Sequence, residues 1–216
     1  AVLIPQRRAE LEGDLALHRR QRHRPADRHD GFLNLAPNAG LLWRIGPGVS
    51  AYASLTRGFR PPQAGELYRL QSQQTRTGLE SETLDSAEAG LHWQRQAVHL
   101  EAAAFAMKKR HVIFQDASRF NIGNGSTRHR GIELQADLRL PSGIYGGLAG
   151  SWSRQTYGFS ALTPGGEEIR RGNDIDTAPR TLGSAHLGLV RGPALAELEW
   201  VHVGRYALDA GNLATY

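Results

Sequence analysis

The chain has 216 residues, of which 40% are hydrophobic, and it carries a formal charge of +5 without a single cysteine. This composition excludes a helical membrane protein, because no uncharged run approaches the roughly 20 apolar residues that a spanning helix needs. It also excludes a disulfide framework and a thiolate metal site. The excess of arginine does not indicate nucleic-acid binding, because the arginines gather in Gly/Pro/Ser-rich segments and are not interleaved with stacking aromatics.

Nine segments are predicted to be strands, because apolar and polar residues alternate in them with a period of two. In chain order they are 9–18, 33–45, 49–57, 84–95, 98–110, 128–140, 144–155, 180–190 and 195–204. In the sixth the alternation runs without a miss, and Ile132 and Leu134 flank Glu133 there. Each strand is therefore expected to have one apolar face and one polar face.

The connections between these segments alternate in length. Short turns are predicted at 45–48, 95–97, 141–143 and 191–194, and long polar connections at 19–32, 58–83, 111–127 and 156–179. This regular alternation is typical of an up-and-down barrel that crosses a membrane, whose turns are short on one side and long on the other. Strands of roughly 9–13 residues also suit a tilted crossing of the bilayer.

The two faces of the predicted strands differ in what they can contact. Acidic residues such as Glu88, Glu101 and Glu133 make the polar face too charged for a packed core, but they suit a water-filled or plugged lumen. Trp43 and Trp93 lie on the apolar face near short turns, where an aromatic girdle is expected. They could equally be core anchors of a soluble sheet, but the charged opposite face favours an apolar face that contacts lipid.

Residues 51–70, with the sequence AYASLTRGFRPPQAGELYRL, resemble a motif of TonB-dependent outer-membrane receptors. In that family a strand of the type lYasyskGFrpP leads into a loop that carries ELY. Four later stretches are similar to segments of the same family in the same order, namely 79–93, 120–138, 172–189 and 203–216. Ser81 departs from the family pattern, which usually has proline at this position.

The resemblance implies an all-β fold, an antiparallel up-and-down transmembrane β-barrel fragment with about nine strands of a larger twenty-two-stranded barrel. Residues 1–216 would form a partial C-terminal β-barrel domain, with the plug domain and the closing strand absent. It further implies an outer-membrane receptor for TonB-dependent uptake of a scarce ligand, such as a ferric siderophore or another metal chelate, and not an enzyme. A passive porin, another outer-membrane barrel and a soluble β-sandwich binding module remain as alternatives.

The implied partners are the TonB complex, acting through the missing plug, a small-molecule metal chelate and outer-membrane lipid. Neither nucleic acid nor a cofactor is expected. Ligands of this family enter from outside and meet loop tips and the upper lumen. By position, the candidate ligand-binding residues are Arg60, Tyr68, Arg69, Arg76, Arg119, Arg128, Arg130 and Tyr157. Arginine and tyrosine suit anionic, aromatic chelates through charge-assisted hydrogen bonds and stacking, although each could instead be a solvated loop residue.

No catalytic or metal site is predicted. His23, Asp27 and His29 lie close together in the sequence, but their spacing matches no regular ligand pattern and Pro25 interrupts it. The segment 58–62, with the sequence GFRPP, is interpreted as structural, because its two prolines end the pairing of a strand and stiffen the start of a loop.

Overall fold

The computed structural model describes residues 30–68, 78–115, 121–163 and 166–216. The chain divides into two units, Ala1–Leu33 and Asn34–Tyr216. The predicted strand at 9–18 and the His23–His29 segment lie outside the described residues. Within those residues, no helix is long and apolar enough to cross a membrane.

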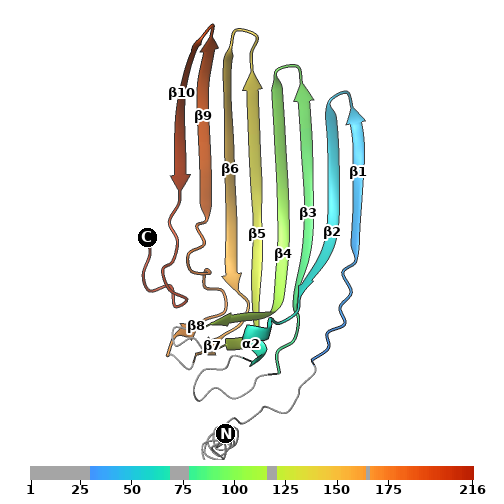
Figure 1. The fold of residues 1–216 in the computed structure, drawn as a ribbon, viewed down its shortest axis with the longest axis vertical. Helices are drawn as coiled ribbons and strands as arrows, with labels where there is room; N and C mark the ends of the chain where they lie inside the picture. Colours follow the sequence, from blue (N-terminus) through green and yellow to red (C-terminus); the bar gives the residue numbers. More distant parts are fainter. Residues whose placement is uncertain (1–29, 69–77, 116–120, 164–165) are drawn as a thin grey trace, which may run out of the picture. The chain divides into compact units, whose positions relative to one another are not determined.

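The described part of the second unit is built around one antiparallel sheet of eight strands, and consecutive members of this sheet pair with each other (Figure 1). The strands are β1 (Asn38–Gly46), β2 (Val49–Arg60), β3 (Glu82–Arg95), β4 (Val98–Gln115), β5 (Asn121–Arg139), β6 (Ile144–Tyr157), β9 (Thr181–Arg191) and β10 (Ala194–Val203). The long connections hold a short helix, α2 (Ala64–Tyr68), and a two-stranded ribbon of β7 (Ala161–Leu162) and β8 (Glu168–Ile169). The prediction of an all-β, up-and-down sheet is confirmed.

The four short turns all lie at one end of the sheet, and the long connections lie at the other (Figure 1). Three of these turns place a glycine in the left-handed region, with φ of 74° at Gly48, 89° at Gly143 and 59° at Gly192. A Cβ at Gly143 would collide with the carbonyl oxygen of Val190 on β9. Both the positive φ and this collision require glycine at position 143. The glycine that predicted a tight turn from the sequence therefore has a direct steric cause.

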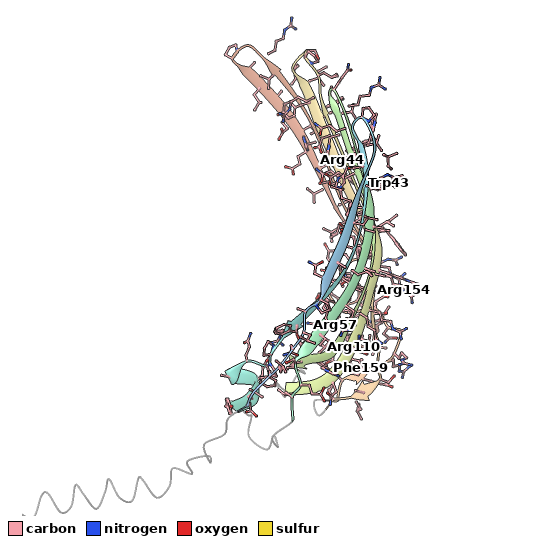
Figure 2. The ribbon with its side chains drawn as sticks, turned by 90° about the vertical axis from the view of Figure 1, so that its right-hand side faces the viewer. Trp43, Arg44, Arg57, Arg110, Arg154 and Phe159 are labelled. Carbon is pink, nitrogen blue, oxygen red and sulfur yellow. The ribbon has the colours of Figure 1, made fainter. Side chains whose placement is uncertain are left out.

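Strand pairing collects the large apolar side chains on one face in lateral rows that run across the sheet. One row contains Trp93, Leu100, Ala136, Leu148, Ala185 and Trp200, and another contains Leu41, Ala53, Ala89, Ala104, Ile132 and Trp152. We call these rows, with the row of Trp43, Leu91 and Leu134 between them, the apolar band. Figure 2 shows a strongly curved sheet with Trp43 on its convex side.

The large apolar side chains of the apolar band are more exposed than is favourable in water. Leu134 is 53% exposed, Trp43 64% and Leu41 70%. A continuous apolar surface of this size marks a site of contact with lipid or with protein. The charged side chains of the opposite face do not suit a packed core, so the convex face is the one expected to contact lipid.

The opposite, polar face is packed by aromatic rings that lie over glycines of neighbouring strands. The ring of Tyr52 covers Gly90, and its hydroxyl donates a 2.6 Å hydrogen bond to Glu88. The ring of Phe105 lies similarly against Gly131. An aromatic side chain replaces in this way the packing that a glycine cannot supply, which explains the glycines in the middle of these strands.

The strands end differently from the prediction at the end of the sheet that carries the long connections. β4 continues to Gln115 and β5 begins at Asn121, whereas the sequence predicted limits of 110 and 128. Beyond the apolar band, residues 112–114 of β4 are three apolar residues in a row, so the alternation disappears although the backbone pairing continues. β1 begins at Asn38 and not at 33, because Pro37 has no N–H for the ladder and only its carbonyl accepts from Arg57 N, at 2.9 Å.

Candidate ligand-facing surface

Three of the eight predicted ligand-binding residues, Arg69, Arg76 and Arg119, lie outside the described residues. The remaining five do not form one site. Arg60, Tyr68 and Tyr157 lie at separate points of the end with long connections, and Arg128 and Arg130 lie within β5. Each position is set by a different part of the sheet, so each is described in turn.

Arg60 is the last residue of β2, and it belongs to a dense ionic cluster. Its Nε donates to Glu82 Oε2 at 2.7 Å, and its guanidinium also donates to Glu66 Oε1 at 3.0 Å. Lys109 Nζ lies 3.0 Å from the same Glu82 oxygen, and the backbone N–H of Ile113 donates to Glu82 Oε1 at 2.7 Å. The charge of Arg60 is therefore used to fix the ends of three strands and the start of the loop.

Glu82 is the centre of this cluster, and its side chain is only 3% exposed. It lies at the end with long connections, beyond the apolar band and thus outside the lipid-facing part of the sheet. Burial alone would raise the pKa of Glu82, but the hydrogen bonds from Arg60, Ile113 and Lys109 outweigh burial and lower the pKa to about 2. The carboxylate is therefore ionised throughout the neutral range.

Tyr68 is the last residue of α2, so part of the segment that the sequence assigned to a loop is a short helix. Glu66 stabilises its beginning by accepting a 2.6 Å hydrogen bond from the backbone N–H of Gln63. Leu67 is buried, whereas Tyr68 is 53% exposed. Of the described candidates, Tyr68 has the aromatic side chain most accessible from the side of the long connections.

Tyr157 ends β6 and anchors the long connection that follows. Its hydroxyl donates a 2.5 Å hydrogen bond to Asp176, and its ring meets Phe159 edge-on with centroids 6.0 Å apart. The same connection packs against the chain that follows β10. Asn212 accepts from the backbone N–H of Asp174 at 2.8 Å and donates to the Asp174 carbonyl, also at 2.8 Å. The two connections therefore form one ordered surface above the end of β6.

Arg128 and Arg130 have the same parity in β5 as Ile132, so they lie on the face of the apolar band. Arg128 pairs with Lys108 of β4, and Arg130 pairs with Arg154 of β6. The prediction placed them with the loop-tip and upper-lumen contacts. Because side chains alternate strictly between the two faces of a strand, both point away from the polar face that carries Glu133.

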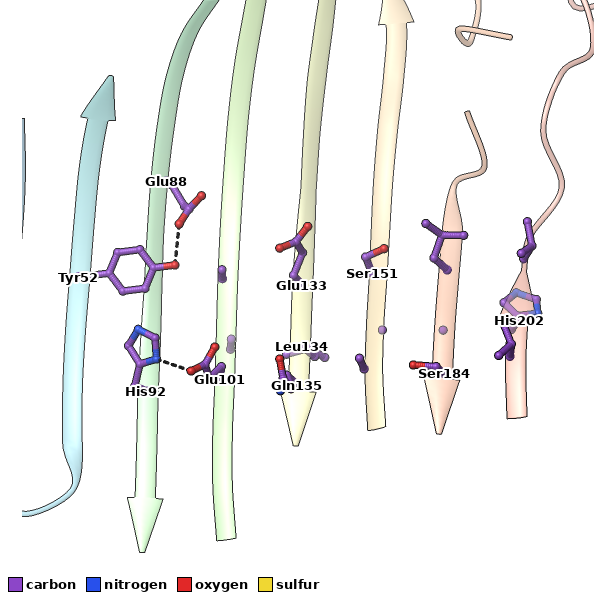
Figure 3. A pocket seen from close by; sticks show the side chains of 18 residues that line it. Tyr52, Glu88, His92, Glu101, Glu133, Leu134, Gln135, Ser151, Ser184 and His202 are labelled. Atoms are coloured by element: carbon purple, nitrogen blue, oxygen red, sulfur yellow. Dashed lines mark hydrogen bonds and ion pairs between the residues drawn. The ribbon is translucent and has the colours of Figure 1, made fainter. Parts of the chain in front are cut away.

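A hollow of about 410 Å³ on the polar face was not among the predicted sites. Tyr52, Glu88, His92, Glu101 and Glu133 from four neighbouring strands, β2 to β5, line part of it (Figure 3). Glu101 Oε1 lies 3.1 Å from His92 Nδ1. This hollow was not predicted because the candidate residues were chosen by their position in loops. The acidic residues on one face of β3, β4 and β5 could have indicated it. The arrangement offers carboxylate, imidazole and hydroxyl groups to whatever fills the lumen.

Comparison with known proteins identifies the fold. Residues 18–216 match the family model described as TonB dependent receptor-like, beta-barrel. No curated protein sequence is similar enough to match. Among solved structures, the chain is similar to the ferric yersiniabactin uptake receptor FyuA from Yersinia pestis, with 21% identity, a TM-score of 0.64, and coverage of 84% of this chain and 28% of that one.

Two other solved structures are similar to the same extent. One is the ferric citrate transporter FecA, with 18% identity, a TM-score of 0.66, and coverage of 82% of this chain and 26% of that chain. The other is the copper transporter OprC, with 14% identity, a TM-score of 0.61, and coverage of 78% and 26%. The chain thus spans about a quarter of the length of these proteins. The family match decides for a receptor of the outer membrane over a porin, a soluble β-sandwich or an enzyme. The chain belongs to the TonB-dependent receptor family, and residues 18–216 are part of its β-barrel.

Proposed function

We propose that the receptor containing this chain takes up a scarce metal chelate across the outer membrane, with a ferric siderophore as the first candidate. The family match over residues 18–216 is the observation that carries this proposal. It is supported by the similarity to proteins named as a ferric yersiniabactin uptake receptor and a ferric citrate transporter. The similarity to a copper transporter means that the fold alone does not select the metal.

The proposed transport needs parts of the receptor beyond this chain. Because the chain spans about a quarter of the length of the solved structures, we assign to it a partial C-terminal barrel domain. A plug from the rest of the protein would close the lumen and contact the TonB complex. The hollow beside Glu101 and Glu133 faces this lumen. Its paired carboxylates and histidines suit hydrogen bonding to a polar plug better than binding of an anionic chelate.

Ligand contact is proposed for cationic and aromatic residues that the sequence places in or next to the long connections. Arg69, Arg76 and Arg119 belong to these connections by sequence position, together with Tyr68 and Tyr157. Arg60 would act indirectly, because its guanidinium already donates to two carboxylates. Arginine binds the oxygens of an anionic chelate by charge-assisted hydrogen bonds, which are about twice as strong as neutral ones.

Uptake of radioactive iron tests this proposal. The whole receptor is expressed in an iron-starved host that lacks its own siderophore receptors, and a panel of ferric chelates is offered. We expect uptake of at least one chelate, abolished by deletion of TonB. Replacing both Arg69 and Arg76 with Gln is expected to raise the KM for that chelate roughly 100-fold, at about one decade for each lost charge-assisted bond.

Arg191→Gln at a short turn on the opposite end of the sheet is the matched control, and it should leave the KM unchanged. Uptake that persists without TonB would contradict active transport. Failure to take up any ferric chelate, together with TonB-dependent uptake of a copper chelate, would overturn the choice of iron.

A further inference from the structure

Four cations meet in two like-charged pairs on the convex face. Lys108 lies directly opposite Arg128, and Arg130 lies directly opposite Arg154. We call these four residues the basic patch. Like charges that face each other across two strands destabilise a sheet unless an anion lies between them. The sheet therefore presents a strained electrostatic arrangement at this point.

The described residues supply little compensating negative charge. Lys108, Arg128 and Arg130 form no ion pair there, and Arg154 Nε lies 3.8 Å from Asp174. Asp174 already accepts two hydrogen bonds from Arg180, at 2.6 and 2.9 Å. The other carboxylate, Asp85, lies directly opposite Lys108 in the ladder, and it forms ion pairs with Arg57 and Arg110. Asp174 Oδ1 faces Arg154 and Asp85 faces Lys108, but these two carboxylates also pair with Arg180, Arg57 and Arg110. The cations thus outnumber the acids here, and an anion from outside the described chain can balance the excess positive charge.

The position of the patch indicates where this anion comes from. Arg130 comes two residues before Ile132 in β5, and Arg154 comes two residues after Trp152 in β6. Both cations therefore lie one step from the apolar band along the same face. Figure 2 places Arg154 on the convex side, as it does Trp43. The patch lies toward the long connections, which is the outer side of the membrane in a barrel of this kind. It therefore lies where the hydrocarbon of the outer leaflet ends and the headgroups begin.

A shallow hollow joins the patch to the apolar band. Its lining includes Leu55, Ala87 and Ala106, the four cations of the patch, and a single carboxylate, that of Asp85. We propose that the basic patch binds the phosphate groups of an anionic lipid of the outer leaflet, whose acyl chains lie on the apolar band. Free phosphate would find the same cations, but it would gain nothing from the adjoining apolar surface. The inference depends on the family assignment and not on the identity of the transported ligand.

Binding of purified lipopolysaccharide to the whole receptor in detergent tests this proposal. The variant Lys108→Gln/Arg128→Gln/Arg130→Gln is expected to bind about 100-fold more weakly, since each cation near an anionic lipid surface contributes roughly a factor of five. The matched control, Arg44→Gln/Arg139→Gln/Arg191→Gln, removes three charges near the short turns. It should bind as tightly as the unmodified receptor.

A second comparison needs no variant, so it holds even if the triple variant fails to fold. The unmodified receptor is expected to bind enzymatically dephosphorylated lipopolysaccharide as weakly as the triple variant binds the phosphorylated form. Equal binding of the two lipids would overturn the proposal, as would a folded triple variant with unchanged affinity. Complete displacement by millimolar inorganic phosphate would overturn the choice of a lipid. Iron uptake by the triple variant should stay normal, which separates this result from that of the proposed transport function.

Discussion

Replacing Glu82 with Gln is expected to loosen the end of the sheet that carries the long connections by about 3 kcal/mol. The buried carboxylate accepts from Arg60, Lys109 and the backbone N–H of Ile113, all within 3.0 Å. The amide retains the shape and one acceptor oxygen, but it leaves Lys109 without its counter-charge and Arg60 with Glu66 alone. Amide hydrogen exchange at Ile113 should accelerate roughly 100-fold, because local opening becomes easier by that free energy.

Glu80→Gln is the matched control for this change. Glu80 lies two residues earlier, is 65% exposed in its side chain, and pairs with His111 at 3.2 Å. An exposed pair of this kind contributes at most about 1 kcal/mol. Exchange at Ile113 should therefore change less than 10-fold in the control. Equal effects of the two substitutions would show that the Glu82 cluster does not hold the strand ends together.

The same cluster predicts a dependence on pH. The pKa of Glu82 falls from an ordinary value of 4.5 to about 2 in the folded chain. A depressed pKa gives stability that is fully present above the unfolded pKa and is lost as the pH falls toward the folded pKa. Between pH 4.5 and 2 the opening of this end should become easier in the unmodified receptor, and this acid sensitivity should be smaller in Glu82→Gln.

Replacing Gly131 with Val is expected to destabilise the barrel by about 3 kcal/mol, the upper end of the usual cost of overpacking. A Cβ at this position would lie 2.5 Å from the carbonyl oxygen of Trp152, 2.8 Å from the ring of Phe105 and 2.9 Å from Ser153. The ring could rotate away, but the backbone carbonyl of β6 cannot move without breaking the ladder. The folded and the unfolded receptor migrate as separate bands on a gel, and the temperature at which heating removes the folded band should be lower for the variant.

Gly150→Val provides the control in the neighbouring strand. A Cβ there meets only the carbonyl oxygen of Leu182, at 3.9 Å, which is ordinary contact. Valine favours a strand, so this variant should be as stable as the unmodified receptor within about 0.5 kcal/mol. If Gly131→Val were equally stable, the close packing of β5 against β6 and Phe105 would be wrong.

The sequence predicted most of the sheet because its apolar face obeys a simple rule. Wherever one face contacts lipid and the other a polar lumen, alternation marks the strand, as from Gly131 to Arg139 in β5. Above the lipid this contrast vanishes, and the extensions of β4 to Gln115 and of β5 from Asn121 left no signal. The helix α2 has five residues, too few for a helical period to become visible.

The ligand-facing residues were harder to predict, because position in a loop says nothing about what a side chain contacts. Arg60 was expected to meet ligand, yet it donates to Glu82 and Glu66. Arg128 and Arg130 already lay in the predicted strand 128–140, but they were grouped with the loop-tip and upper-lumen contacts, whereas their parity in β5 places them on the convex face. The parity of Ile132 and Leu134 already contained this information, since it continues without interruption to Arg128.

The account depends above all on which face of the sheet meets lipid. This chain contains no cysteine, so once any cysteines in the rest of the receptor are replaced, single substitutions from Ile132→Cys to Leu138→Cys can each carry a spin label in lipid bilayers. Accessibility to oxygen, which concentrates in hydrocarbon, should peak at even positions such as Ile132 and Leu134. Accessibility to a water-soluble nickel complex should peak at odd positions such as Glu133 and Gln135. The reverse order, or no period of two, would contradict a convex face in contact with lipid.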